Sequence, residues 1–290
     1  MARILVTGAQ GQLGQELGIE LLREGFEVVK AGRDLLDITK EQEVFAAISN
    51  LKLDAVINAA AYTAVDKAES EQSLAYEINA LGPKYIAQAC AHNHIPLIHI
   101  STDYVFAKST GKSHTEDEQT YCEGVYAQTK LDGENFIKES GCKYLIVRTS
   151  WVFGRFGKNF VKAIFNKAKN SDTLAVVDDE LGNPTPALGL AYGIVKMLKQ
   201  VLMPDFDAFG TYHFSGMPAL NRYEFAKEIV RIASEGKYLD HEVKITAIKK
   251  ADLNLSARRP DDSLLNCSKC ENIFNLTMPS WRDYILQTLD

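Results

Sequence analysis

Two side chains near the middle of the chain have the residue types and the spacing needed for acid–base chemistry. Tyr126 and Lys130 form a Tyr-x-x-x-Lys pattern within the helix-like stretch VYAQTKLDGENF. Because residues four apart lie on one face of a helix, the phenol and the ammonium can share a pocket. The phenol has an ordinary pKa of ~10, which a nearby positive charge lowers. We therefore expect Tyr126 to protonate a carbonyl oxygen, with Lys130 supplying the field.

A hydroxyl group that could hold this carbonyl ends a strand-like run earlier in the chain. The stretch IPLIHIST (95–102) ends in Ser101 and Thr102 and is followed by Asp103. In open α/β sheets, the carboxyl ends of the strands face the crevice where ligands bind. Thr102 or Ser101 can therefore bond the carbonyl and complete a catalytic triad with the tyrosine and the lysine.

The N-terminal glycines have the spacing of a phosphate-binding turn. Gly8, Gly11 and Gly14 lie between a strand-like run (3–7) and a helix-like stretch (15–25). A diphosphate needs backbone that it can approach closely, and the first turn of a helix supplies unpaired N–H groups and a favourable dipole. The G-x-x-G-x-x-G spacing is the short-chain variant of the dinucleotide motif. We expect a nicotinamide dinucleotide here, with its ribose bonded by the catalytic lysine.

The end of the next strand-like segment bears on the choice of cofactor. Residues 26–32 (FEVVKAG) end without an acid and are followed by Arg33 and Asp34. An acid at this place bonds the adenosine ribose, whereas an arginine accommodates a 2′-phosphate. The pattern favours NADPH over NADH, although an arginine exposed in a loop would look the same in the sequence.

A regular alternation of strands and helices places these residues. The apolar patterns predict strands at 3–7, 26–32, 54–61, 95–102 and 143–150. They predict helices at 15–25, 73–93 and 124–140, and one more helix that is capped by Asp37 or Thr39 and ends near residue 52. Repeated βαβ units of this kind predict a doubly wound, parallel, Rossmann-like sheet with helices on both faces.

The alternation loosens after Ser150. The remaining pattern predicts a loop at 175–187 and helices at 159–171, 188–202 and 222–236. We expect residues 1–150, with about 185–213, to form an NAD(P)-binding domain. Residues from about 151–184 and 214–290 should form a smaller C-terminal lobe that binds the substrate, packed directly on the first because no low-complexity linker separates them.

Composition argues against several other classes of protein. The chain has 290 residues and a net charge of −6, which is unsuited to nucleic acid as the main partner. It contains no apolar run of the ~18 residues that a membrane-spanning helix needs, and its N-terminus has no signal-peptide pattern, so we expect a cytoplasmic protein with reduced cysteines. Cys267 and Cys270 form a C-x-x-C without a second ligand pair, and His92 and His94 fit a loop, so no metal site is expected.

Several longer stretches resemble the dTDP-4-dehydrorhamnose reductase family of the extended short-chain dehydrogenase/reductase superfamily. They cover nearly the whole chain and comprise TGAQGQLG (7–14), LDIT (36–39), NAAAYTAVDKAE (58–69), STDYVF (101–106), YAQTK (126–130), RTSWVFG (148–154) and RRPDDSLL (258–265). The wider short-chain class does not share the third and sixth of these. The resemblance implies hydride transfer from NAD(P)H to C4 of dTDP-4-dehydro-L-rhamnose, giving dTDP-L-rhamnose, with Tyr126 as the proton donor.

The resemblance also implies roles for individual residues. With the residues above, it implies a cofactor site formed by Gly8, Gly11, Gln12, Leu13, Gly14, Arg33, Asp37, Ile38, Ala60, Ala61, Thr63, Tyr126 and Lys130. Thr102, the triad hydroxyl, and Asp103 would contact the sugar, and Trp151 would pack against it. Asn159 and Arg259 occupy positions where the family contacts the nucleotide diphospho-sugar.

The assembly and the exact reaction stay open at this stage. Some members dimerise through magnesium held by glutamates; Glu16 is present, but LGLAYGIV carries no acid and the chain ends QTLD, so we expect a monomer or a homodimer without a magnesium bridge. One alternative function is a non-catalytic, NADP-binding regulatory subunit of the methionine adenosyltransferase type, which the intact triad disfavours. Another is a reductase or epimerase of a different nucleotide-linked 4-keto sugar.

Overall fold

A six-stranded parallel sheet forms the centre of the computed structural model, which describes residues 1–108, 111–253 and 256–289. Its strand order is β10-β5-β4-β3-β1-β2. The strands are β1 (Arg3–Thr7), β2 (Glu27–Ala31), β3 (Ala55–Asn58), β4 (Leu97–Thr102), β5 (Tyr144–Thr149) and β10 (Gly210–His213). The order reverses between β1 and β3, which is where ligands bind in doubly wound sheets. The predicted fold class is confirmed.

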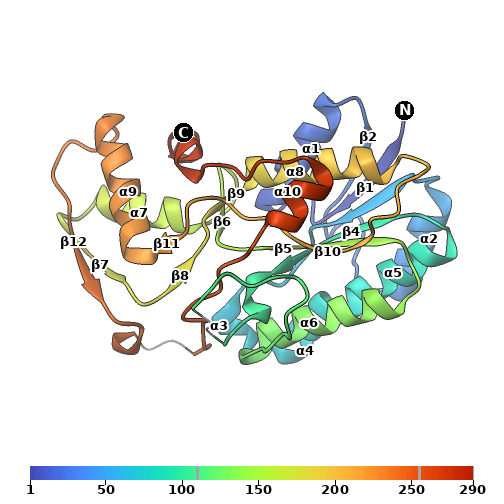
Figure 1. Ribbon diagram of the computed structural model, residues 1–290, viewed down its shortest axis with the longest axis horizontal. Helices are drawn as coiled ribbons and strands as arrows, with labels where there is room; N and C mark the ends of the chain where they lie inside the picture. The colour runs from blue at the N-terminus through green and yellow to red at the C-terminus, as the bar shows by residue number, and fades with distance from the viewer. Residues whose placement is uncertain (109–110, 254–255, 290) are drawn as a thin grey trace.

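Helices cover both faces of this sheet (Figure 1). On one face, α1 (Gln12–Arg23) packs beside α8 (Ala187–Val201), and their apolar side chains form one core with β1 and β5. On the other face lie α2 (Glu41–Asn50), α5 (Gly82–His92) and α6 (Gly124–Glu139). Because both faces are covered, the strands are near-continuous apolar runs, as the sequence indicated.

Two predicted helix boundaries differ from the structure. The helix α2 begins at Glu41 with Lys40 as its N-cap, because the carboxylate of Asp37 accepts hydrogen bonds from the N–H and hydroxyl of Thr39 in a turn before the helix. The helical stretch predicted at 73–93 is helical throughout but changes its type along the way. It runs as α4 (Gln72–Tyr76), a π-helical turn at Glu77–Leu81, and α5 with Pro83 in its first turn.

The segment predicted as a loop at 175–187 instead contains short strands, which correct that expectation. Here β7 (Thr173–Val177), β8 (Leu181–Gly182) and β9 (Thr185–Pro186) pair respectively with β12 (Lys244–Ile248), β11 (Leu220–Asn221) and β6 (Val152–Phe153). Each of these pairs joins segments more than thirty residues apart in the chain. Local sequence therefore carries little signal for them.

These short strands belong to a second layer beside the sheet, at the left of Figure 1. Around them pack α7 (Phe160–Ala168), α9 (Arg222–Glu235) and α11 (Ile285–Leu289). Their core includes Phe153, Phe225 and Trp281, all fully buried. The short helix α3 (Val65–Ala68) follows β3, and α10 (Ser268–Phe274) packs back on the main sheet's core.

The cysteine pair is part of that core. Cys267 and Cys270 are buried at α10, both as free thiols, and burial raises the pKa of each.

The carboxylate of Glu16 is also buried and accepts two hydrogen bonds from Arg155, at 2.8 and 3.0 Å. Within the described part of the chain, no group of three or more His, Cys, Asp or Glu side chains could hold a metal ion, and no helix is long and apolar enough to cross a membrane.

Candidate active site

Two neighbouring cavities follow the carboxyl edge of the sheet. The larger has a volume of about 590 Å³ and includes Tyr126, Lys130 and Trp151 in its lining. The smaller has a volume of about 420 Å³ and is lined partly by Arg33 and Asp37. Both cavities share Gly11, Ala59, Ala61 and Thr63. They therefore form one continuous cleft across the point where the strand order reverses.

The glycine turn lies where the two cavities meet, and each glycine is needed for a different reason. Gly8 has a φ of +65°, and a Cβ there would lie 2.5 Å from the backbone nitrogen of Ala60. A Cβ on Gly14 would lie 2.2 Å from the carbonyl oxygen of Gly8. Gly11, in contrast, is exposed to the cleft and caps α1 without a side-chain hydrogen bond. The first N–H groups of α1 thus face a space without side chains, which suits a diphosphate.

The other predicted cofactor residues divide between the two cavities. Gln12, Leu13 and Gly14 line the larger one, while Gly8, Ile38 and Ala60 line the smaller one. The Arg33 guanidinium is 73% exposed and lies 3.9 Å from the carboxylate of Asp37. That carboxylate is already bonded to Thr39, so of the two side chains the arginine is the freer to meet a ligand.

Tyr126 and Lys130 project from α6 into the larger cavity, beside Thr102 at the end of β4. The expected lowering of the phenol pKa is wrong. Burial, together with the Asp103 carboxylate, raises the pKa of Tyr126 to about 12, and a hydrogen bond from Thr102 acts in the opposite direction. Burial also lowers the pKa of Lys130 to about 8, so the lysine is a weaker source of positive charge than its type suggests. A phenol with this pKa is protonated at neutral pH and can donate its proton.

The hydroxyls of Ser101 and Thr102 have different partners. Ser101 donates to the carboxylate of Glu134 at 2.6 Å, and Arg148 holds the same carboxylate at 2.7 and 2.9 Å. Although burial favours the neutral acid, Arg148 holds the pKa of Glu134 below its ordinary value. Ser101 is thus committed to a buried ion pair. The Thr102 hydroxyl, in contrast, donates to Asp103 and accepts from the N–H of Tyr104, each at 3.2 Å, and it also contacts the phenol of Tyr126.

Asp103 connects the end of β4 to the C-terminal segment. Its carboxylate accepts a hydrogen bond from the hydroxyl of Ser263 at 2.5 Å, and both residues are buried. Burial raises the pKa of Asp103 to about 6, although the hydroxyls of Ser263 and Thr102 favour the charged form. Since Asp103 also lines the larger cavity, its charge is available to hydroxyl groups of a ligand.

Trp151 lies at the wall of the larger cavity in an unusual backbone conformation, with a φ of +44°. Its indole fits against Gly182, where a Cβ would lie only 2.4 Å from Cε2 of the ring. The guanidinium of Arg222 lies 3.6 Å from the centroid of the indole and 3.4 Å from the carboxylate of Glu180. The guanidinium of Arg222 therefore lies against the aromatic wall that Trp151 forms in this cavity.

Sequence reasoning missed Arg222 and Lys158, which both line the larger cavity. Arg222 is the first residue of α9, and an arginine at the start of an amphipathic helix looks like an ordinary surface charge. Only the pairing of β8 with β11 brings it to Trp151. Lys158 follows Gly157, in a segment with no recognisable pattern.

Asn159 and Arg259 do not line either cavity. Asn159 is the N-cap of α7: its side-chain oxygen accepts from the N–H of Lys162 at 3.1 Å, and its amide donates to the carbonyl of Gly154 at 2.7 Å. Arg259 binds the carboxylate of Asp66 at 2.6 Å. Both side chains therefore have partners within the protein.

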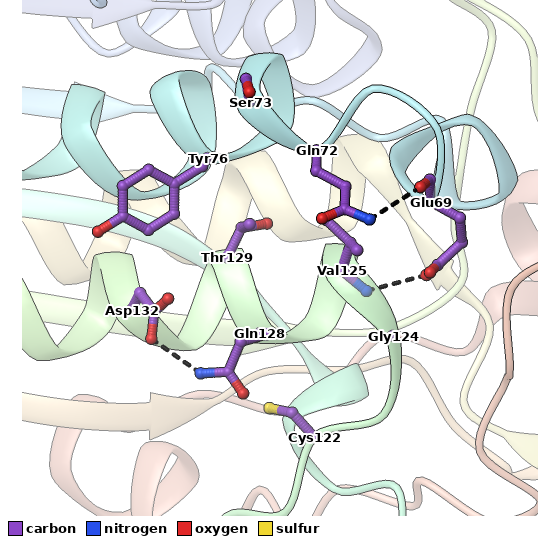
Figure 2. Close-up of a pocket in the computed structure, with 10 residues that line it drawn as sticks. All are labelled: Glu69, Gln72, Ser73, Tyr76, Cys122, Gly124, Val125, Gln128, Thr129 and Asp132. Atoms are coloured by element: carbon purple, nitrogen blue, oxygen red, sulfur yellow. Dashed lines mark hydrogen bonds between the residues drawn. The ribbon is translucent and has the colours of Figure 1, made fainter.

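A third cavity, of about 580 Å³, lies between α4 and α6 and is drawn in Figure 2. Glu69 accepts a hydrogen bond there from the N–H of Val125 at 2.9 Å, and Gln128 donates to Asp132 at 2.8 Å. Thr129 and Cys122 also line it, but none of the predicted site residues does. This space is therefore separate from the cleft.

Comparison with known proteins identifies the family. A family model described as the RmlD substrate binding domain matches residues 2–290. A protein from Aggregatibacter actinomycetemcomitans named dTDP-4-dehydrorhamnose reductase is 38% identical over 283 residues, which cover 97% of this chain and 96% of the relative. This chain belongs to the dTDP-4-dehydrorhamnose reductase family. The family member from Escherichia coli K12 is 35% identical, with 96% of this chain and 94% of that protein covered.

Solved structures agree with this assignment. The dTDP-4-dehydrorhamnose reductase of Clostridium acetobutylicum superposes with a TM-score of 0.90 at 36% identity, covering 98% of this chain and 97% of that one. The family member from Bacillus anthracis, solved in complex with NADP, also has a TM-score of 0.90, at 34% identity, with 100% and 99% covered. A Thermus thermophilus UDP-glucose 4-epimerase, at 20% identity and a TM-score of 0.79, shares the fold.

Proposed function

We propose that this protein is a dTDP-4-dehydrorhamnose reductase, which reduces the C4 carbonyl of dTDP-4-dehydro-L-rhamnose with a nicotinamide cofactor. The observation that carries the proposal is the meeting of Thr102, Tyr126 and Lys130 in one cavity that continues into the glycine turn. Full-length similarity to proteins of that name supports the choice of substrate.

The cofactor side of the cleft suits a dinucleotide. The uncapped N-terminus of α1 would bind the diphosphate. The adenosine half would lie in the smaller cavity near Ile38 and Ala60, and the nicotinamide half would lie near Tyr126, where it supplies a hydride. We propose NADPH as the preferred form, because exposed Arg33 is placed to meet a 2′-phosphate and a relative at 34% identity was solved with NADP.

The residues around the carbonyl would divide the chemistry between them. Thr102 donates a hydrogen bond that orients the substrate oxygen, and Tyr126 gives it a proton as negative charge develops there. A phenol pKa of about 12 keeps that proton in place until the oxygen becomes basic. Lys130 holds the ribose from the same helix face.

The sugar nucleotide would enter from the second layer. The indole of Trp151 offers an apolar wall to the deoxysugar, and Asp103 accepts bonds from its hydroxyls. Arg222 and Lys158 line the cavity and would bind the diphosphate. We propose the same role for Arg259 and Asn159 once substrate displaces their present partners.

We further propose that different parts of the chain bind the cofactor and the sugar nucleotide. Residues 1–150 with about 185–213 would bind NAD(P), since they contribute all six strands of the sheet together with α1 and α8. Residues of about 151–184 and 214–290 would bind the sugar nucleotide, since they supply Trp151, Lys158 and Arg222.

The test is a reaction with defined substrate and product. Purified protein is mixed with NADPH and dTDP-4-dehydro-L-rhamnose, cofactor oxidation is followed by absorbance, and the product sugar is identified by NMR. The Tyr126→Phe variant is expected to be inactive, and Tyr121→Phe, at an exposed tyrosine, is the matched control. Formation of dTDP-L-rhamnose by the wild type and the control supports the proposal. Absence of oxidation, or a product with another configuration at C4, would overturn it.

A further inference from the structure

A row of buried polar side chains crosses the sheet and leads to Lys130. Thr7 on β1, Asn58 on β3 and His99 on β4 lie opposite one another in the register of the three parallel strands. Each is at most 1% exposed. In the sequence, these residues lie in the strand patterns at 3–7, 54–61 and 95–102, and none of them was predicted as a site residue.

Short contacts connect this row to the catalytic lysine. The Thr7 hydroxyl donates to Oδ1 of Asn58 at 2.7 Å, and Nδ2 of Asn58 lies 3.0 Å from Nδ1 of His99. The other ring nitrogen, Nε2, lies 3.3 Å from Nζ of Lys130. Nζ also donates to the carbonyl oxygen of Ile100 at 2.7 Å.

The direction of these hydrogen bonds follows from one fixed donor. The backbone N–H of Ala60 points at Oδ1 of Asn58 from 3.2 Å, and an N–H requires an acceptor, so the oxygen of the amide must be on that side. The amide nitrogen then faces His99 and donates to Nδ1. Complete burial lowers the pKa of His99 well below its ordinary value, so the ring is neutral. A neutral imidazole that accepts at Nδ1 carries its proton on Nε2.

That proton points at Lys130, and an ammonium has no lone pair to receive it. We propose that His99 is a positioning residue whose Nε2–H donates a hydrogen bond to Nζ of Lys130. Lys130 then works as an amine that gains and loses a proton rather than as a permanent cation. The amine uses its lone pair for His99 and one N–H for the carbonyl of Ile100. Its second N–H remains for the cavity that it lines.

This inference rests on the proposed function and deepens it, because it sets the charge that Lys130 brings to the cavity it shares with Tyr126. As an amine, Lys130 adds no permanent positive charge beside the phenol. The phenol therefore keeps its proton until negative charge develops on the substrate oxygen.

The other charged groups near Lys130 do not offset the effect of His99 on the pKa of the lysine. Glu134 lies one turn further along α6 and favours the ammonium, but its carboxylate is bound by Arg148 and Lys138. Burial already lowers the pKa of Lys130 to about 8. A donor aimed at Nζ lowers it further, because a third proton on nitrogen would face the Nε2 proton.

The test measures the tautomer of His99 directly in cofactor-free, full-length wild-type protein labelled with ¹⁵N-histidine. We expect Nε2 to have the chemical shift of a protonated ring nitrogen and Nδ1 that of an unprotonated one. His99→Gln assigns the signals, and His92→Gln, at an exposed histidine, is the control. A protonated Nδ1, or an imidazolium, overturns the inference whether or not the enzyme reduces the proposed sugar.

A second measurement follows the ionisation of Lys130 through the ¹³C shift of its Cε. In the wild type the transition should lie below about pH 8, and in His99→Phe, which keeps a ring but removes the donor, it should move up by about one pH unit toward the 10.5 of a free lysine. An unchanged transition in a folded variant would overturn the inference. If His99→Phe does not fold, the wild-type tautomer still decides.

Discussion

Adding one methyl group at Gly182 should impair use of the sugar nucleotide without touching the cofactor. An alanine Cβ there would lie 2.4 Å from Cε2, 2.6 Å from Cζ2 and 2.8 Å from Nε1 of Trp151. Carbon atoms pack at about 3.5 Å, so the indole must retreat by about 1 Å. The Arg222 guanidinium, 3.6 Å from the ring centroid, must move with it. A displacement of this size at a substrate wall costs up to ~100-fold in rate.

We expect Gly182→Ala to lower kcat/KM for the sugar nucleotide by about 10- to 100-fold. Overpacking should cost about 1–3 kcal/mol of stability, which thermal melting can measure. The dissociation constant of NADPH, measured by fluorescence, should stay within about twofold, because Gly182 lines neither cavity.

A double-mutant cycle tests whether the effect passes through the indole. Trp151→Phe removes the ring atoms that the new methyl group would meet, so in that background Gly182→Ala should cause little further loss. The reasoning fails if Gly182→Ala lowers kcat/KM equally in both backgrounds, since the damage would then come from β8 itself and not from the wall of the cavity.

Three further predictions concern single side chains. Tyr126→Phe should lower kcat by ~10²–10⁴-fold with NADPH affinity unchanged, because only the proton donor is lost; near-normal turnover in steady-state assays would refute the assignment. Arg33→Ala should lower kcat/KM for NADPH and leave that for NADH unchanged, and a wild-type preference for NADH would contradict the role of this arginine. Asp103→Asn should melt at a higher temperature than the wild type at about pH 7.5 but not at about pH 4. Burial raises the pKa of Asp103 from 3.8 to about 6, so its ionised form costs the folded state about 3 kcal/mol, and the wild type should lose stability as the pH rises between those values. Equal melting temperatures at both pH values would show that the carboxylate is not destabilising.

The parts of this protein that sequence predicted well are those set by local pattern. The strand at 3–7 and the helix at 124–140 lie within one residue of β1 and α6, because a buried strand and a long amphipathic helix each have a clear period. The spacing of Tyr126 and Lys130 is itself a helical period, so both reach the same cavity.

What the sequence did not predict depends on contacts between distant segments. Arg222 reaches Trp151 only through the pairing of β8 with β11, and Gly182 is needed only because that indole lies on it. The phenol pKa of Tyr126 rises instead of falling because burial outweighs the hydrogen bond with Thr102, and burial is a property of the whole fold. Asn159 is the N-cap of α7 in the structure, a role that the sequence analysis did not assign to it.

The place of β10 in the sheet has a consequence for synthesis of the chain on the ribosome. β5 is complete at Thr149, but the strand that pairs with its outer edge, β10, begins only at Gly210. Until about sixty further residues have emerged, the amide and carbonyl groups on that edge have no strand partner. During this interval a nascent chain can pair edge to edge with another, and a fragment ending near residue 150 would expose the same edge permanently. Expression of such a fragment should therefore give aggregates, whereas a fragment extended past His213 can close its sheet.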